Sequence, residues 1–142
     1  MNTEAIYSAL FSLVSAAPGL NKTSRRLTSF ADIPVADTPA LFQLQKTETA
    51  AVSTKTPAKW SIAVELVLFV NTGGLDMTVV PSTVLNPIKD AIISMFALPM
   101  HGEQTLGGLV SRCRVDGAIQ IVEGVQGDTA ICIIPVTLFF PE

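Results

Sequence analysis

Hydrophobic residues near the start of the chain recur at helical spacing and predict a first helix over residues 3–17. Asn2 or Thr3 can accept hydrogen bonds from the free amides of its first turn, and Pro18-Gly19 ends it. The apolar face consists of Ile6, Leu10, Leu13, Val14 and Ala17.

A second helix is predicted over residues 87–97. Asn86 is a favourable N-cap, and Pro87 suits the first helical position because its missing N–H has no partner there. The apolar residues at helical spacing are Ile88, Ala91, Ile92, Met95 and Phe96.

Alternating or continuous apolar runs predict the strands. The clearest covers residues 60–70, which are apolar on both faces, as in a central strand covered on both sides. Further strands are predicted over residues 22–28, 41–46 and 129–140. Pro135 indicates a sheet edge or a bulge within the last strand, because proline cannot donate to the hydrogen-bond ladder.

Residues 109–124 admit two interpretations. Asp116-Gly117 is typical of the tight turn of a β-hairpin. One continuous strand separates apolar from polar residues better, and we favour such a strand with a kink or bulge at Gly117. Its apolar side then holds Cys113, Val115, Ile119 and Ile121.

Residues 47–59 lack any core pattern and are long for a hairpin connection. We expect residues 47–58 to form a protruding β-hairpin arm. The order of elements is then α-β-β-β-α-β-β. This order predicts one α+β domain over residues 1–142, with two main helices packed on a mixed, mainly antiparallel β-sheet.

Composition adds that the surface is thinly charged. Of the 142 residues, 49% are hydrophobic and 15% are charged, whereas soluble domains carry about 25% charged residues. An obligate subunit interface would bury the excess apolar surface, and a compact monomer with a large core is the alternative. The longest apolar stretches fall short of the ~20 residues that a spanning helix needs, so no membrane partner is expected.

The net charge is −3, and Arg25-Arg26 is the longest basic run. The chain therefore lacks the electrostatic pattern of a dedicated nucleic-acid-binding protein.

Residues typical of catalysis are sparse. His101 is the one histidine, and we expect it to be an exposed loop residue rather than a metal ligand or the partner of a cysteine. The first helix carries Glu4 rather than the positive charge that precedes a signal peptide. Cys113 and Cys132 are therefore expected to be buried, reduced thiols. We predict no catalytic residue, no metal and no cofactor.

Several short segments, in their order and spacing, resemble one known family over nearly the whole chain. They are Ser24-Arg25-Arg26-Leu27, Ala31-Asp32-Ile33-Pro34, Pro39-Ala40-Leu41-Phe42, Lys59-Trp60, Leu85-Asn86-Pro87-Ile88 and Gln104-Thr105-Leu106-Gly107-Gly108. With them the chain resembles the tail terminator, or tail completion, proteins of long-tailed bacteriophages.

The resemblance implies a non-enzymatic structural protein of the virion, assembled in the host cytoplasm. Such proteins form a hexameric ring that caps the head-proximal end of the tail tube. The ring stops tube polymerisation and offers a joining surface to the connector of the head. Its partners would be copies of itself, the tail tube protein and the head connector, while DNA passes through the lumen without sequence-specific binding.

Candidate contact residues with other subunits or the tube follow from the enrichment of Trp and Arg at interfaces and from the arm. They are Arg25, Arg26, Thr47, Glu48, Lys55, Lys59, Trp60, Arg112 and Arg114. Core packing is the alternative for Trp60, and a solvated edge for Arg25 and Arg26. Arg112 and Arg114 can instead pair with Asp116 or with Glu65, which needs a positive partner if buried.

Two other functions stay open at this point. One is another neck or head-completion ring protein. The other is a small cytoplasmic α+β enzyme or ligand-binding domain, which would show a closed polar pocket with clustered titratable side chains.

Overall fold

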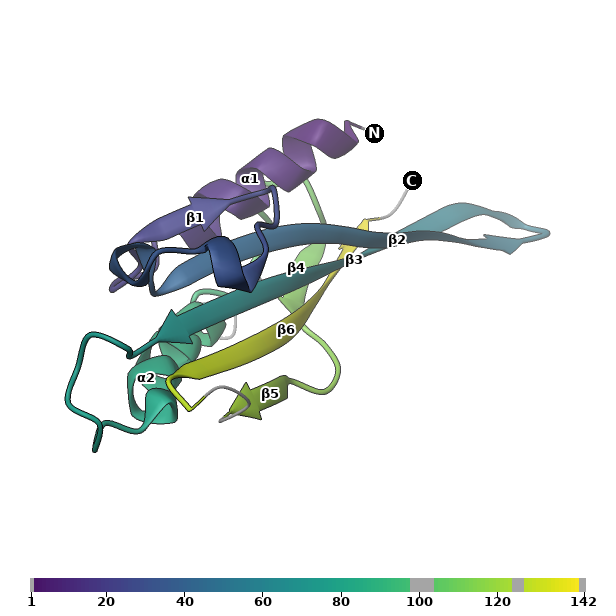
Figure 1. Cartoon of the computed structure of the whole chain (residues 1–142). Helices are drawn as coiled ribbons and strands as arrows, with labels where there is room; N and C mark the ends of the chain where they lie inside the picture. The colour runs from purple at the N-terminus through teal and green to yellow at the C-terminus, as the bar shows by residue number, and fades with distance from the viewer. Residues whose placement is uncertain (1, 98–103, 124–126, 141–142) are drawn as a thin grey trace.

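The computed structural model describes residues 2–97, 104–123 and 127–140, and its centre is a six-stranded β-sheet with two helices on one face (Figure 1). The helices are α1, Thr3–Ser15, and α2, Pro81–Ser94. The strands are β1, Lys22–Ser24; β2, Ala40–Ser53; β3, Thr56–Asn71; β4, Arg112–Val115; β5, Gln120–Glu123; and β6, Thr129–Phe140. Two 3-10 turns, η1 (Phe30–Asp32) and η2 (Val35–Asp37), lie between β1 and β2.

The strands lie in the order β1-β2-β3-β6-β4, and β5 also pairs with β6. β1 and β2 are parallel, and every other pair is antiparallel. The predicted α+β class is therefore confirmed, with a mixed, mainly antiparallel sheet and two helices.

The larger core lies between the sheet and the helices. Leu10 and Val14 of α1, and Leu85 and Ile92 of α2, are fully buried there. Each such side chain contributes about 1.5–3 kcal/mol of burial free energy. Alternate residues of the central strand face this core, namely Ile62, Val64, Leu66, Leu68 and Val70.

Among the described residues, the opposite face of the sheet is covered at one end. Phe30 of η1 stacks on Phe69 of β3 with ring centres 4.9 Å apart, and Ile33 and Phe42 complete this smaller core. Nearer the arm, this face is only half-buried. The central strand is thus covered on both sides over half its length, not all of it as predicted.

The first helix begins as predicted and ends two residues earlier, and Asn2 Oδ1 accepts a 3.1 Å hydrogen bond from the Ala5 amide. The prediction for the second helix was wrong at its start. α2 begins at Pro81 rather than Pro87, Asn86 is not its N-cap, and Pro87 lies inside it. Pro87 removes one backbone hydrogen bond, and the buried apolar face of α2 holds the helix together across that position.

The predicted strand over residues 109–124 is broken into β4 and β5, which lie end to end along the same edge of β6. The hairpin alternative was wrong, because both segments run antiparallel to β6. Val115 pairs with Val136, and Gln120 pairs with Ile133. The four residues between Val115 and Gln120 therefore stand opposite only two residues of β6. The expected bulge at Gly117 is therefore confirmed.

Pro135 explains the position of this break. The Asp116 amide donates to the Pro135 carbonyl at 3.1 Å, so the side of Pro135 that lacks an N–H faces the bulge. A regular neighbouring strand would place a backbone carbonyl opposite the nitrogen of Pro135, which has no hydrogen to donate. β6 is not a sheet edge, so of the two alternatives for Pro135 only the bulge is correct, and it lies in the neighbouring strand.

Candidate interaction surfaces

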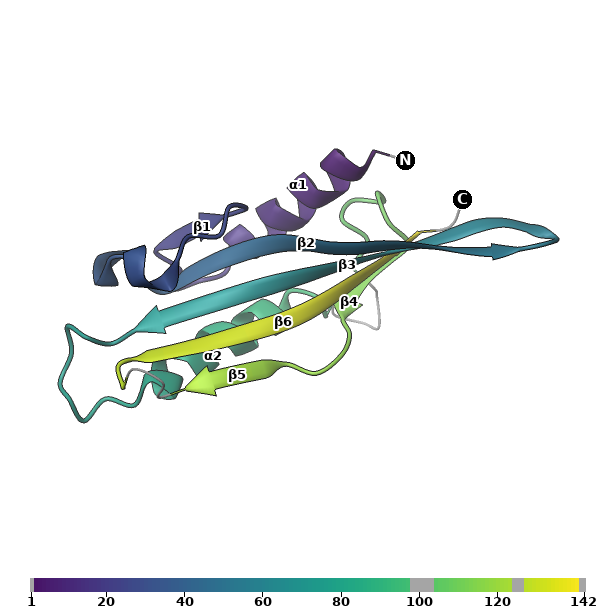
Figure 2. The same cartoon turned by 45° about the vertical axis from the view of Figure 1, so that its right-hand side comes forward.

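The arm is a two-stranded ribbon that continues β2 and β3 beyond the rest of the sheet (Figure 2). Toward the arm, the pairing of β3 with β6 ends at Trp60, opposite Phe140. Beyond it, residues 51–59 pair only with one another. The predicted hairpin arm is confirmed, and the strands predicted over 41–46 and 60–70 are longer because they run through it.

The predicted arm residues are distributed along this ribbon and are all exposed. Thr47 and Glu48 lie at its base, opposite Ala63 and Ile62. Lys55 lies in the terminal turn, and Lys59 pairs with Ala51.

Two contacts fix the base of the arm. The buried Tyr7 of α1 donates its hydroxyl hydrogen to Glu48 Oε1 at 2.7 Å. Burial first, and then this hydrogen bond, raise the pKa of Tyr7 above its ordinary value. Trp60 is half-buried and packs on the helix-side core, as in the core-packing alternative.

Arg25 and Arg26 follow β1 and have different surroundings. The Arg25 guanidinium binds both carboxylate oxygens of Glu4, at 2.5 and 3.2 Å, and lies 5.9 Å from the centre of the Tyr7 ring. The hydrogen bond from Arg25 holds the pKa of Glu4 below its usual value. The side chain of Arg26 is exposed. Arg25 thus ties α1 to the segment after β1.

Arg112 and Arg114 lie on the open face of the sheet. Their guanidinium carbons are 4.4 and 5.6 Å from the centre of the Phe139 ring. These arginines were candidate partners for Glu65 if it is buried, but Glu65 is half-exposed and binds Lys46 at 3.4 Å instead. Within the described ranges neither arginine has a carboxylate partner. Two cations therefore share one aromatic ring on this face.

Both cysteines are buried and free, as predicted. Burial raises the pKa of Cys113 to about 12 and that of Cys132 in the same direction. A thiol with a raised pKa is a poor nucleophile, because the thiolate is the reactive form. His101 lies outside the described residues.

The described residues contain no group of three or more His, Cys, Asp or Glu side chains that could hold a metal ion. None of the described helices is long and apolar enough to cross a membrane.

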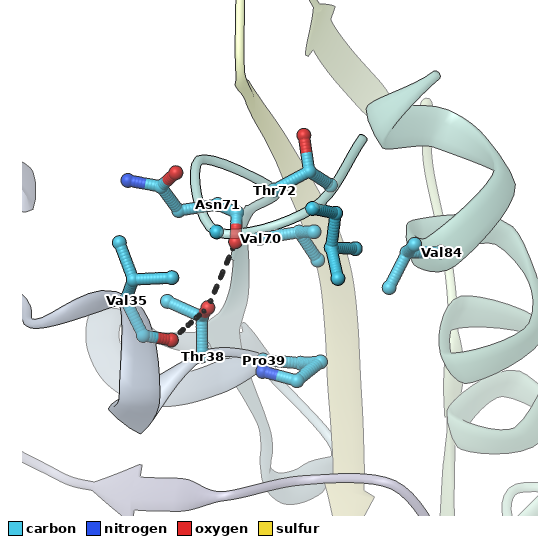
Figure 3. Close-up of a pocket in the computed structure, with 9 residues that line it drawn as sticks. Val35, Thr38, Pro39, Val70, Asn71, Thr72 and Val84 are labelled. Carbon is cyan, nitrogen blue, oxygen red and sulfur yellow. Dashed lines mark hydrogen bonds between the residues drawn. The ribbon is translucent and has the colours of Figure 1, made fainter. Parts of the chain in front are cut away.

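A cavity of about 260 Å³ lies at the end of the sheet opposite the arm (Figure 3). Val35 and Pro39 form one wall, Val84 of α2 lies opposite them, and Val70 and Leu75 contribute further apolar surface. None of the lining residues is ionisable.

The hydroxyl groups of the cavity wall are already engaged. Thr38 Oγ1 lies 2.7 Å from the Val35 carbonyl oxygen and 3.3 Å from that of Asn71. The hydroxyl of Thr72 donates to the Asp128 carbonyl at 3.1 Å. The cavity therefore favours an apolar occupant.

The hydrophobic pattern predicts no element and no site at this end of the molecule. In the segment between β3 and α2, Met77 is 99% exposed and Leu75 57% exposed. Apolar side chains in a glycine-containing link were the available signal. They did not reveal that this segment meets η2 and α2 around a cavity.

No protein-family profile matches the chain, and no functionally characterised protein matches it by sequence. Solved structures match it in fold. One is a chain of the structure described as "Virion of native gene transfer agent (GTA) particle", with a TM-score of 0.52 and 12% sequence identity. The match covers 99% of this chain and 97% of that chain. At this identity the similarity concerns the fold.

Proposed function

We propose that this chain is a non-enzymatic structural subunit of a phage-like virion, and that it forms a hexameric ring at the head-proximal end of the tail tube. The observation that carries the proposal is the fold match along 99% of the chain to a chain of a virion particle. In this role the ring ends tube polymerisation and presents a surface to the connector of the head.

The arm supports a role in assembly. Its ribbon is exposed on both faces, and Val52 near its tip is 79% exposed. An isolated two-stranded ribbon is marginally stable in water. A neighbouring subunit or a tube protein would cover the arm and stabilise it.

The chemistry of the cavity and the thiols also favours a structural role. The cavity is smaller than the ~300–1,000 Å³ of typical small-molecule sites, and its lining carries no group that could act as an acid or a base. The two thiols are buried. These features differ from the closed polar pocket expected of an enzyme.

The charge of the chain suits a passage for DNA. Affinity for phosphates depends on Lys and Arg, and this chain has a net charge of −3. A ring of such subunits would let DNA pass without holding it.

A tube-length assay tests the proposal. The tail tube protein of the same genome is polymerised with and without this protein, and tube lengths are measured by electron microscopy. We expect shorter, capped tubes, with the protein located at one end only. Unchanged lengths and no bound protein would contradict the proposal, and binding to the head connector alone would favour another neck ring.

A further inference from the structure

The tip of the arm combines one exposed apolar side chain with two lysines. The register of the ribbon shifts between Ala51 and Ser53, so that Val52 of β2 stands opposite two residues of β3, Pro57 and Ala58. The extra residue of this bulge lies on β3, and the side chain of Val52 is 79% exposed. Lys55 lies on the turn side of Val52, and Lys59 pairs with Ala51 beside it.

The charge of this tip is uniformly positive. From Thr49 to Lys59 the arm carries these two lysines and no carboxylate. The tip therefore carries one exposed apolar side chain and two cations, at the end of a ribbon that packs on none of the other described residues (Figure 2).

The cavity at the other end of the molecule has the complementary pattern. Its walls are aliphatic and its hydroxyl groups are engaged internally, so an apolar side chain fits it without leaving a buried polar group unsatisfied. At about 260 Å³ it suits a side chain rather than a cofactor.

Two acidic residues adjoin the lining of this cavity. Asp76 follows the lining residue Leu75, and Asp128 is joined to the lining residue Thr72, whose amide donates to its carbonyl at 2.7 Å. In the described part of the chain neither carboxylate forms an ion pair. The Thr78 amide and hydroxyl donate to Asp76 Oδ1 at 2.8 and 2.9 Å, and they keep its pKa below the usual value.

We propose that the arm of one copy of this chain docks at the cavity of the next copy. Val52 enters the cavity, and the positive tip that carries Lys55 and Lys59 lies against the acidic rim that carries Asp76 and Asp128. The occupant is a second copy because the charges match in sign and number, and because the two surfaces lie at opposite ends of the same chain, where they cannot meet within one molecule.

The geometry of this contact is head-to-tail. Each copy gives one arm and receives one, so a closed ring leaves no arm and no cavity unoccupied. The inference rests on the proposed ring and identifies the contact that closes it.

The test uses two full-length charge-reversal variants. The arm-reversed variant carries Lys55→Glu and Lys59→Glu, and the pocket-reversed variant carries Asp76→Lys and Asp128→Lys. Each variant by itself brings like charges together at every contact. We expect its subunit dissociation constant to rise at least about tenfold, measured by sedimentation velocity.

Mixing the two variants is the decisive part of the experiment. In an alternating assembly every contact again joins opposite charges, so the mixture recovers association to within about threefold of the unaltered protein. Asp116→Lys, which reverses an exposed charge in the β4–β5 break, is the matched control and leaves association unchanged. Circular dichroism of each variant checks that the fold is intact.

Zero-length carbodiimide cross-linking gives a second readout, which also works when the ring forms only on tube ends. A mixture of ¹⁴N- and ¹⁵N-labelled protein should yield cross-linked peptides that join an arm lysine of one label to Asp76 or Asp128 of the other.

Reversal variants that assemble as tightly as the unaltered protein, or a mixture that does not recover, would overturn this docking mode. In that case a protein that still caps tubes keeps the proposed function. A protein that neither self-associates nor binds tubes would contradict the proposed function, and the docking mode with it.

Discussion

Tyr7 is the residue through which the first helix holds the base of the arm. Its ring is buried in the helix-side core, and its hydroxyl reaches Glu48, 41 positions further along the chain. The backbone carbonyl of Tyr7 accepts a hydrogen bond from the side-chain amide of the buried Gln43 at 3.0 Å. Arg25 lies over the same ring. One side chain thus couples α1, β2 and the segment after β1.

We predict that Tyr7→Phe lowers the free energy of unfolding by about 1 kcal/mol, because it removes one hydrogen bond and keeps the packed ring. Glu48→Gln, which keeps an acceptor for the hydroxyl, is the matched variant and should cost less. Urea denaturation at neutral pH measures both. A larger loss for Glu48→Gln than for Tyr7→Phe would contradict the assignment of this bond.

We expect the buried thiol of Cys113 to lower the free energy of unfolding at alkaline pH. Its pKa is raised from 9.0 to about 12 in the folded chain, so the unfolded chain loses this proton first. The contribution of this thiol to the free energy of unfolding is complete below about pH 9 and declines above it, by at most about 1.4 kcal/mol per pH unit. Cys113→Ala should flatten the decline in unfolding free energy between about pH 9 and pH 12. An unchanged slope in the variant would argue against a buried thiol.

At the scale of elements, the broken edge strand and the arm are two departures from a regular sheet. The break between β4 and β5 is set by Pro135 and by Gly117, whose φ of +118° is favourable only for glycine. The arm contains a register shift between Ala51 and Ser53 and packs on none of the other described residues. The first departure is explained within the chain, and for the second we propose a partner in another molecule.

Gly117→Ala is predicted to destabilise the chain by about 1–3 kcal/mol. An added Cβ would lie 3.3 Å from Pro135 Cγ, and the backbone conformation is strained for any residue with a side chain. Gly107 also has a positive φ, of +71°, but open space around it. Gly107→Ala is therefore the matched control and should cost less in thermal unfolding. Equal costs would show that the contact with Pro135 does not matter.

Removal of the arm should separate folding from assembly. Residues 51–59 can be replaced by Asn-Gly, a two-residue turn that joins the cross-strand pair Ala50 and Trp60. The excised side chains contribute no core contact, so the unfolding free energy should change by only about 0.5 kcal/mol, while self-association is lost. Retained association with an intact fold would mean that the arm is not an assembly element.

At the scale of the whole molecule, periodicity predicted the class of the fold and most strands. It failed where a local signal competed with packing. Asn86-Pro87 has the chemistry of a helix start, yet the buried face around Leu85 extends α2 back to Pro81. Arg112 and Arg114 were candidate partners for a buried Glu65, but Glu65 lies on the half-buried part of the open face and pairs with Lys46 of the neighbouring strand β2.

The candidate site was predictable only in part. The arm was visible as a polar segment too long for a hairpin turn, whereas the cavity was not, because its walls come from β3, α2 and the segment around η2. The two ends of the molecule acquire their complementary character only in the folded chain. The arm carries the 79% exposed Val52 at one end of the molecule, and the aliphatic cavity lies at the other end. A ring of identical subunits would use these two features.

The most direct test of the central claim is the mass of the assembled protein, measured by native mass spectrometry over a range of concentrations and in the presence of tail tubes. A closed six-subunit ring predicts a species of about 91 kDa, six times the 15.1 kDa subunit, with few intermediates. A monomer at every concentration, with no binding to the tubes, would contradict the account.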